Sequence, residues 1–177
     1  MPVVPVSDAR SPFVLAIDAG TSSVRALVFD QRGNPVEGAE AQVPYRIETT
    51  PDGGATFEAD ALFDITVDTI DRLVQSSADV LEQVVAVGTT SFWHSLLGLA
   101  PDGTPCTPVY YWADTRSASD ALALRQELDA HAVWQRTGCR LHPSYWPAKL
   151  RWLQLSEPAM TGDVARWVSF PEYALGR

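Results

Sequence analysis

The stretch FVLAIDAGTSSVRALVFD, residues Phe13–Asp30, consists of two apolar segments separated by a short polar turn. Phe13–Ile17 is a continuous apolar run, which is typical of a strand buried on both faces. The segment Val24–Phe29 predicts a second, mostly buried strand. We therefore expect a tight hairpin whose turn, Asp18–Ser23, carries one carboxylate, one glycine and three hydroxyls.

The composition of this turn suits two different roles. Backbone N–H groups of a glycine-containing turn form a concave nest for anions, and the hydroxyls of Thr21, Ser22 and Ser23 add donors. The Asp18 carboxylate would repel a phosphate unless a divalent cation lay between them, and Mg²⁺ binds through one or two carboxylates, water and phosphate oxygens. The alternative is a hydroxyl-rich hairpin in which Asp18 accepts hydrogen bonds from the turn itself.

The composition is that of a soluble globular domain. The 177 residues are 46% hydrophobic and carry a net charge of −9, which argues against nucleic-acid binding. Residues 1–12, expected as a loose leader, lack the pattern of a secretory signal, and no apolar run is long enough to span a membrane. Cys106 and Cys139 are expected to be free thiols in a reducing cytoplasm, with a disulfide as the alternative.

Further along the chain, apolar runs and periodic segments predict more strands and helices. The expected strands are 36–47, 84–87 and 94–99. A first helix is expected to start near Glu58 and Asp60 and to place Phe63, Val67, Ile70 and Val74 on one face, with Leu62, Ile65 and Leu73 beside them. Two more helices are expected at 117–131, with a capping box of Ser117 and Asp120, and at 146–156. This order predicts an α/β fold whose mixed sheet opens with an antiparallel β-β-β meander and is flanked by helices. It fits the ribonuclease H-like or actin-like ATPase fold rather than a Rossmann fold.

The strand from Val84 should deliver a polar segment to the end of the sheet, where ligands of open sheets gather. There, Trp93 offers a flat apolar face, and His94 can donate and accept hydrogen bonds to hydroxyl groups of a ligand. The alternative is a core tryptophan and an internally bonded histidine. Asp114 and Arg116 follow an aromatic run and suit either ligand binding or a local ion pair.

The hairpin turn resembles the first phosphate motif of the actin, heat-shock ATPase and sugar-kinase superfamily, D-x-G-T-S/T-x-x-R/K. Later segments narrow the resemblance to the FGGY family of carbohydrate kinases. Within that family, the sequence around His94 and the segment Trp112–Arg116 are most similar to gluconate kinases. The segments are VAVGTTSFWHSLLGLAPDGTP from Val85, YYWADTRS from Tyr110, TGCRLHPSYWPAKLRWL from Thr137 and SFPEYAL from Ser169. Together they cover nearly the whole chain.

The resemblance implies ATP and Mg²⁺ as cofactors, with Asp18 positioning the metal. The phosphate-binding residues that it implies are Asp18, Gly20, Thr21, Ser22, Ser23 and Arg25. The sugar-binding candidates are Trp93, His94, Asp114, Arg116 and Tyr145. Trp93 departs from the Met-His and Arg-Glu pairs common in the family. Gluconate also needs a positive partner, for which the candidates are Arg116, Arg140 and Lys149, the last expected to be structural or solvated.

The implied reaction moves the γ-phosphoryl group of ATP to a hydroxyl of a sugar or sugar acid, with gluconate favoured. Alternatives are xylulose, ribulose or glycerol as substrate, a non-catalytic sugar-binding module, and an actin-type assembly ATPase. The resemblance implies that residues 13–177 form most of the N-terminal domain and that the catalytic base and adenosine site lie in a C-terminal lobe absent here. We therefore expect the 177-residue chain alone to be inactive and to self-associate, as in a homodimer, with no nucleic-acid or membrane partner.

Overall fold

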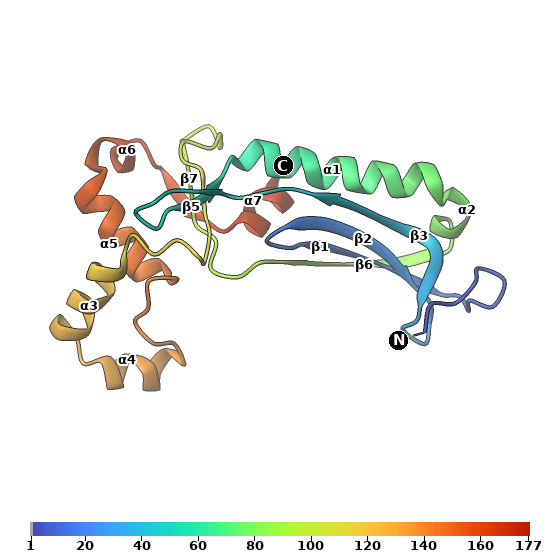
Figure 1. The fold of residues 1–177 in the computed structure, drawn as a ribbon, viewed down its shortest axis with the longest axis horizontal. Helices are drawn as coiled ribbons and strands as arrows, with labels where there is room; N and C mark the ends of the chain where they lie inside the picture. Colours follow the sequence, from blue (N-terminus) through green and yellow to red (C-terminus); the bar gives the residue numbers. More distant parts are fainter. Residues whose placement is uncertain (1) are drawn as a thin grey trace. The chain divides into compact units, whose positions relative to one another are not determined.

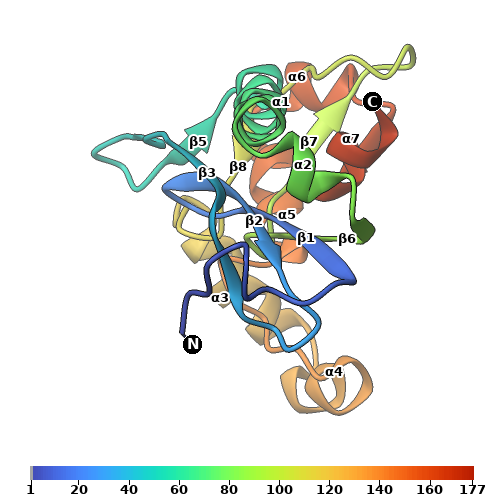
Figure 2. The ribbon, with the colours of Figure 1, turned by 90° about the vertical axis from the view of Figure 1, so that its right-hand side faces the viewer.

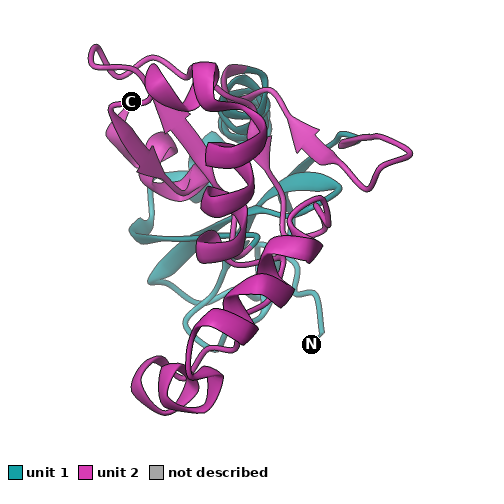
Figure 3. Ribbon diagram, turned by 90° about the vertical axis from the view of Figure 1, so that its left-hand side faces the viewer, with its two compact units in different colours: residues 1–46, 61–92 teal, residues 47–60, 93–177 magenta. Residues whose placement is uncertain are grey.

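The computed structural model describes residues 2–177, which divide into two compact units (Figure 3). The first unit consists of the chain up to residue 46 together with residues 61–92. The second consists of residues 47–60 and 93–177. Each unit has its own β-structure and its own core, so each is described separately.

The first unit is built on a four-stranded mixed sheet in the order β3-β2-β1-β6. The first three strands form the antiparallel meander predicted from the sequence, and β6 pairs with β1 in parallel. The strand bounds are β1 Phe13–Ala19, β2 Ser23–Phe29, β3 Pro35–Pro44 and β6 Val84–Ser91. The predicted mixed α/β sheet is therefore confirmed.

The helix α1, Ala59–Ser76, runs along one face of this sheet (Figure 1) and is seen almost end-on in Figure 2. The short helix α2, Ala78–Leu81, follows it. Side chains from both helices and three strands form one core. Its buried members are Phe13, Leu15, Ala26, Val28, Val36, Ala39, Leu73 and Val80. This core fixes the hairpin that carries the predicted phosphate turn.

The buried side of α1 is not the predicted apolar face. Val67 and Val74 are exposed, whereas Leu62, Thr69 and Leu73 are fully buried. Two adjoining apolar stripes run along this helix, and the sequence pattern does not say which faces inward. Thr69 can occupy the buried stripe because its hydroxyl donates to its own helix, at Ile65 O (2.7 Å).

The segment expected as a loose leader is hydrogen-bonded to the sheet. Val4 N donates to Pro35 O at 2.9 Å, and Glu37 N donates to Val4 O at 2.8 Å. Gln31 N donates to Arg10 O at 2.9 Å. Residues 2–12 therefore lie against β3 and the β2–β3 turn.

The second unit contains two small antiparallel sheets and five helices. The strands are β4 Glu48–Thr49, β5 Ala55–Phe57 and β8 Val109–Tyr110 in one sheet, and β7 Leu97–Leu99 and β9 Arg166–Val168 in the other. The helices are α3 Ala118–Glu127, α4 Ala130–Thr137, α5 Trp146–Ser156, α6 Pro158–Gly162 and α7 Phe170–Gly176. Leu96, Tyr110 and Leu153 form the centre of one core cluster, against which Trp146 and Trp152 pack.

Helix 146–156 is confirmed with the predicted bounds, but the predicted helix 117–131 is two helices. The break falls at Leu128, and Asp129 caps the second helix by accepting from His131 N and Ala132 N, both at 3.0 Å. The capping box predicted at Ser117 is absent because the Ser117 hydroxyl donates to Pro143 O instead. None of the helices described combines the length and apolar character needed to cross a membrane.

Candidate functional site

The turn between β1 and β2 is held closed by its own backbone and by one tyrosine. Gly20 N donates to Ser23 O at 2.9 Å. Tyr45, directly after β3, donates its backbone N–H to Ser22 O at 3.0 Å and its phenol to Gly20 O. Its ring is buried. Tyr45 thus anchors the turn to the third strand, a contribution that the sequence analysis missed although an aromatic residue ending a polar strand was visible there.

Asp18 stands at the entrance of this turn with its carboxylate uncommitted. Asp18 is the register partner of Arg25, but within residues 2–177 the carboxylate forms no ion pair or hydrogen bond. The alternative, in which Asp18 accepts hydrogen bonds from the turn, is therefore wrong. A Cβ added at Gly20 would lie 3.2 Å from Ser23 O and 3.8 Å from Asp18 Oδ2, so glycine leaves the space beside the carboxylate open.

The turn offers one carboxylate together with hydroxyl and N–H groups, which fits a metal ion that arrives bound to a nucleotide better than a metal ion held only by protein side chains. Among the described residues, no group of three or more His, Cys, Asp or Glu side chains could hold a metal ion. Mg²⁺ is typically held by one or two carboxylates with water and phosphate oxygens supplying the rest of its octahedron. One free carboxylate at Asp18, next to a glycine turn with hydroxyls, meets that requirement.

Strand β6 brings a second row of hydroxyls to the same end of the sheet. Thr89 and Thr90 are the register partners of Ile17 and Asp18. The strand continues to Ser91, four residues beyond its predicted end at Val87, and Phe92 N then donates to Ala19 O at 3.1 Å. The expectation that this strand delivers polar residues to the end of the sheet is therefore confirmed.

Two of the predicted phosphate-binding residues have different surroundings. The Ser23 hydroxyl is buried and accepts from Gln42 Nε2 on β3 at 2.9 Å, which favours a role in joining the strands. Arg25 lies on β2 with an exposed side chain. Thr21 and Ser22, in the turn itself, are more accessible than Ser23.

In the second unit, His94 and Tyr145 come together from segments far apart in the sequence. Their ring centroids lie 4.3 Å apart, and the centroid of the His142 ring lies 5.7 Å from that of the Tyr145 ring. His94 has a φ of 59°, a conformation rare for residues other than glycine, which ends the β6 segment before β7 begins. The predicted strand 94–99 is accordingly reduced to Leu97–Leu99.

Trp93 is 75% exposed, so the alternative of a core tryptophan is wrong. Its ring meets the His94 ring edge-on at 5.9 Å between centroids. The pKa of His94 is lowered, first by burial and then by the positive charges of His142 and Lys149. His94 is therefore neutral at pH 7, with one ring nitrogen able to donate and the other able to accept.

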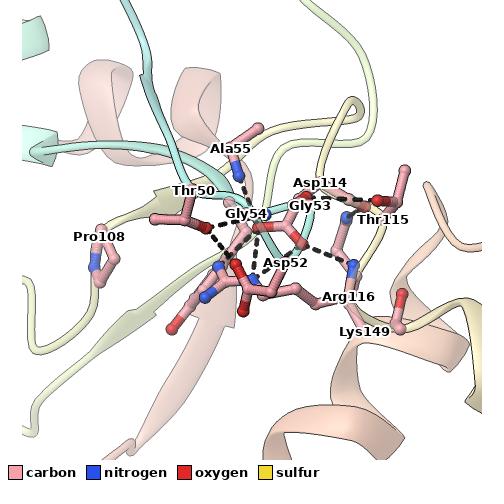
Figure 4. Close-up of polar contacts among 12 residues, drawn as sticks. Thr50, Asp52, Gly53, Gly54, Ala55, Pro108, Asp114, Thr115, Arg116 and Lys149 are labelled. Atoms are coloured by element: carbon pink, nitrogen blue, oxygen red, sulfur yellow. Dashed lines mark hydrogen bonds and ion pairs between the residues drawn. The ribbon is translucent and has the colours of Figure 1, made fainter.

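Asp114 and Arg116 form the local ion pair that the sequence analysis gave as the alternative to sugar binding (Figure 4). The Asp114 carboxylate is buried, accepts from Ala55 N at 3.0 Å and takes two nitrogens of the Arg116 guanidinium, the closer at 2.6 Å. The same guanidinium lies over the Trp152 ring at 4.5 Å. The pair thereby ties the start of β5 to the loop after β8.

Lys149 supports the same loop from α5. It is buried, and its ammonium donates to the backbone oxygen of Asp114 at 2.9 Å. Burial lowers the pKa of Lys149 to about 8, the Asp114 carboxylate opposes that shift, and the Arg116 charge adds to it. Three basic residues were candidates for binding the carboxylate of gluconate. Arg116 is paired with Asp114 and Lys149 is buried, whereas Arg140 is exposed.

Comparison with known proteins agrees with this arrangement. The model of the FGGY family of carbohydrate kinases, N-terminal domain, matches residues 13–175. The chain is 26% identical to gluconokinase of Bacillus licheniformis over 161 residues, covering 91% of this chain and 31% of the relative. It is 33% identical to glycerol kinase of Gloeobacter violaceus over 146 residues, covering 82% of this chain and 28% of the relative. The chain thus spans about a third of the length of these curated relatives.

Solved structures show the same fold. Xylulose kinase from Rhodospirillum rubrum superposes with a TM-score of 0.85 at 23% identity, over 92% of this chain and 33% of that one. Gluconate kinase from Lactobacillus acidophilus superposes with a TM-score of 0.81 at 24% identity, and the match covers 92% of this chain and 32% of that one. The predicted ribonuclease H-like, actin-like ATPase fold is therefore confirmed. With the matching family model over nearly all of its length, the chain belongs to the FGGY family of carbohydrate kinases and carries the family's N-terminal domain.

Proposed function

We propose that this chain supplies the phosphate-binding turn and the sugar-binding residues of an ATP-dependent carbohydrate kinase. The enzyme would transfer the γ-phosphoryl group of Mg²⁺-ATP to a hydroxyl of a sugar or sugar acid, with gluconate as the favoured substrate. The observation that carries this proposal is the uncommitted Asp18 carboxylate on a glycine turn that is surrounded by hydroxyl and backbone donors.

In this proposal the turn holds the phosphates, and Asp18 holds the magnesium ion through water. The backbone N–H groups and hydroxyls of Thr21 and Ser22 would face the phosphate oxygens, Gly20 would leave room for their approach, and Arg25 would add positive charge nearby. Bound Mg²⁺ would neutralise charge that develops on the phosphate oxygens during transfer. Because Tyr45 and the β1–β2 pairing fix the turn beforehand, little reorganisation is needed at the moment of reaction.

The sugar would be bound by His94, Tyr145 and Trp93. A neutral imidazole that can both donate and accept suits a hydroxyl, and the exposed indole of Trp93 suits the apolar face of a sugar. Asp114 and Arg116 would not contact the sugar but would fix the loop that carries Trp112. The backbone oxygen of Trp112 accepts a hydrogen bond from Ser144 Oγ at 2.7 Å, next to Tyr145 in the chain. We assign no catalytic base to the described residues.

Gluconate is favoured because the gluconokinase of Bacillus licheniformis matches 91% of this chain. Lys149 adds a positive charge that acts on His94, which would favour an anionic substrate. The match to glycerol kinase of Gloeobacter violaceus supports glycerol as the second candidate. We place the reaction in the cytoplasm, where the free thiols of Cys106 and Cys139 would stay reduced.

A phosphorylation panel on the intact protein tests the proposal. ADP release would be measured with ATP, Mg²⁺ and one acceptor at a time from gluconate, xylulose, ribulose and glycerol. We expect turnover to depend on an acceptor and to have the highest kcat/KM with gluconate. A higher kcat/KM with another acceptor would overturn the choice of gluconate, and sugar binding without any ADP release would favour a non-catalytic sugar-binding module.

A further inference from the structure

A pocket of about 480 Å³ lies between α3, α4 and the segment that follows α4, all within the second unit. Its volume is in the range of small-molecule sites. The residues that line it are Arg125, Ala130, His131, Trp134, Arg140 and Leu141. None of them is given a role in the proposed kinase reaction, although Arg140 was one of three candidates in the sequence for contact with gluconate.

Two guanidinium groups reach this pocket without a carboxylate partner. Arg125 donates through Nε to Leu141 O at 2.8 Å, a bond that fixes the side chain and leaves its two terminal nitrogens available. Arg140 is exposed and precedes Leu141 in the chain. Within residues 2–177, neither arginine forms an ion pair.

The acidic residues near the pocket are engaged elsewhere. Asp129 caps α4 through His131 N and Ala132 N. Glu127 forms two hydrogen bonds with Arg151, at 2.5 and 2.9 Å. No acidic side chain is among the residues that line the pocket, so its lining carries the positive charges of Arg125 and Arg140 in a chain whose net charge is −9.

An aromatic surface adjoins these charges. Trp134 is 46% exposed, and its ring centroid lies 5.8 Å from that of His131. Arginine forks match phosphate oxygens in pairs, and an indole face suits the apolar side of a sugar ring. We propose that this pocket is a second ligand site, which binds a small sugar phosphate with its phosphoryl group on Arg125 and Arg140 and its ring on Trp134.

The proposal can be tested by measuring the NMR signal of Trp134 while a ligand is added. The intact protein would be labelled with 5-fluorotryptophan, and the ¹⁹F resonance of Trp134 would be assigned with the Trp134→Phe variant. We expect glucose 6-phosphate to shift this resonance in a saturable way and glucose to leave it in place. Arg140→Gln should weaken the binding about tenfold, because it removes a charge-assisted fork while breaking no hydrogen bond within the described chain.

Arg136→Gln is the matched control, because Arg136 is an exposed arginine of α4 that does not line the pocket. It should leave the affinity for glucose 6-phosphate unchanged. Failure of glucose 6-phosphate to move the Trp134 resonance would overturn the proposal. So would an equal loss of affinity in Arg136→Gln and Arg140→Gln, or an equal shift by glucose. Binding of the same probe at the proposed kinase site would not depend on Arg140, so the two sites are distinguishable.

Discussion

Asp18 on β1 and Thr90 on β6 are register partners on two parallel strands. In such a pair the side chains leave the sheet on the same face. A carboxylate and a hydroxyl from two distant segments of the chain are thereby placed at one end of the sheet, beside the glycine turn. This relationship gives the proposed phosphate site a second wall that the turn alone does not supply.

Replacing Asp18 by asparagine should impair the intact enzyme strongly without unfolding it. The carboxylate has no partner in the described chain, so its loss removes no internal contact, whereas a metal-bound phosphate loses its carboxylate. We expect kcat/KM for ATP to fall by about 10²-fold or more, measured by steady-state kinetics at several Mg²⁺ concentrations. Glu40→Gln, which removes an exposed charge from β3, is the control and should leave kcat/KM near wild type.

Tyr45→Phe tests whether the turn is held from the third strand. The variant keeps the buried ring and removes the hydrogen bond from the phenol to Gly20 O. We expect a loss of about 1 kcal/mol in the free energy of unfolding, measured with urea, and a KM for ATP raised several-fold. An unchanged KM together with lost stability would show that Tyr45 serves the fold alone.

The Asp114–Arg116 pair should matter chiefly for stability. Arg116→Gln leaves the buried carboxylate of Asp114 without its cation, which we expect to cost about 3 kcal/mol in urea unfolding. Arg116→Lys should not restore this loss, because an ammonium cannot make the two-nitrogen contact or lie flat over Trp152. Breaking the exposed Arg72–Asp68 pair is the comparison, and its cost should not exceed about 0.5 kcal/mol.

The local pattern of the sequence was sufficient to predict the hairpin, a strand beginning at Val84 and helix 146–156, but not that this strand pairs with β1 in parallel. Continuous apolar runs and a proline at the helix start dictate these elements without help from distant residues. The break at Leu128 was not predicted, because Asp129 can serve either as a cap or as an ordinary helix residue. Only the surroundings select the cap.

The candidate site was predictable in part for the same reason. Asp18 and Gly20 belong to a contiguous motif, so their proximity follows from the chain itself. The contact between the His94 and Tyr145 rings depends on how α5 packs, and the burial of Lys149 next to Asp114 depends on a tertiary contact. Neither contact leaves a periodic signal in the sequence.

The edge strand β6 should drive self-association of the 177-residue chain. It is the last strand of its sheet, and Val85 and Val87 on it are 69% and 56% exposed. A bare edge with apolar side chains is a template for pairing with another chain. We expect a concentration-dependent dimer or larger species by light scattering, which Val87→Lys should reduce. Val74→Lys, at an exposed valine of α1, should leave it unchanged, and a monomeric wild-type chain would contradict the expectation.

Lys149 should make the stability of the chain rise between pH 8 and pH 10. Its pKa is about 8 in the folded chain and 10.5 when unfolded, so in this interval the unfolded lysine binds a proton that the folded one has released. Unfolding then takes up a proton, and raising the pH disfavours it. The free energy of unfolding should increase by about 2 kcal/mol across the interval, measured with urea at each pH.

Lys149→Met separates this effect from other titrations, because it keeps the apolar stem and removes the proton-binding group. The variant should lose the rise with pH, whatever its stability at pH 7. Lys149 is the only lysine of the chain, so its ¹³Cε resonance also reports its pKa directly. A folded-state pKa near 10.5 would show that the ammonium is solvated, and the support that it gives to the Asp114 loop would then have to come from Arg116 alone.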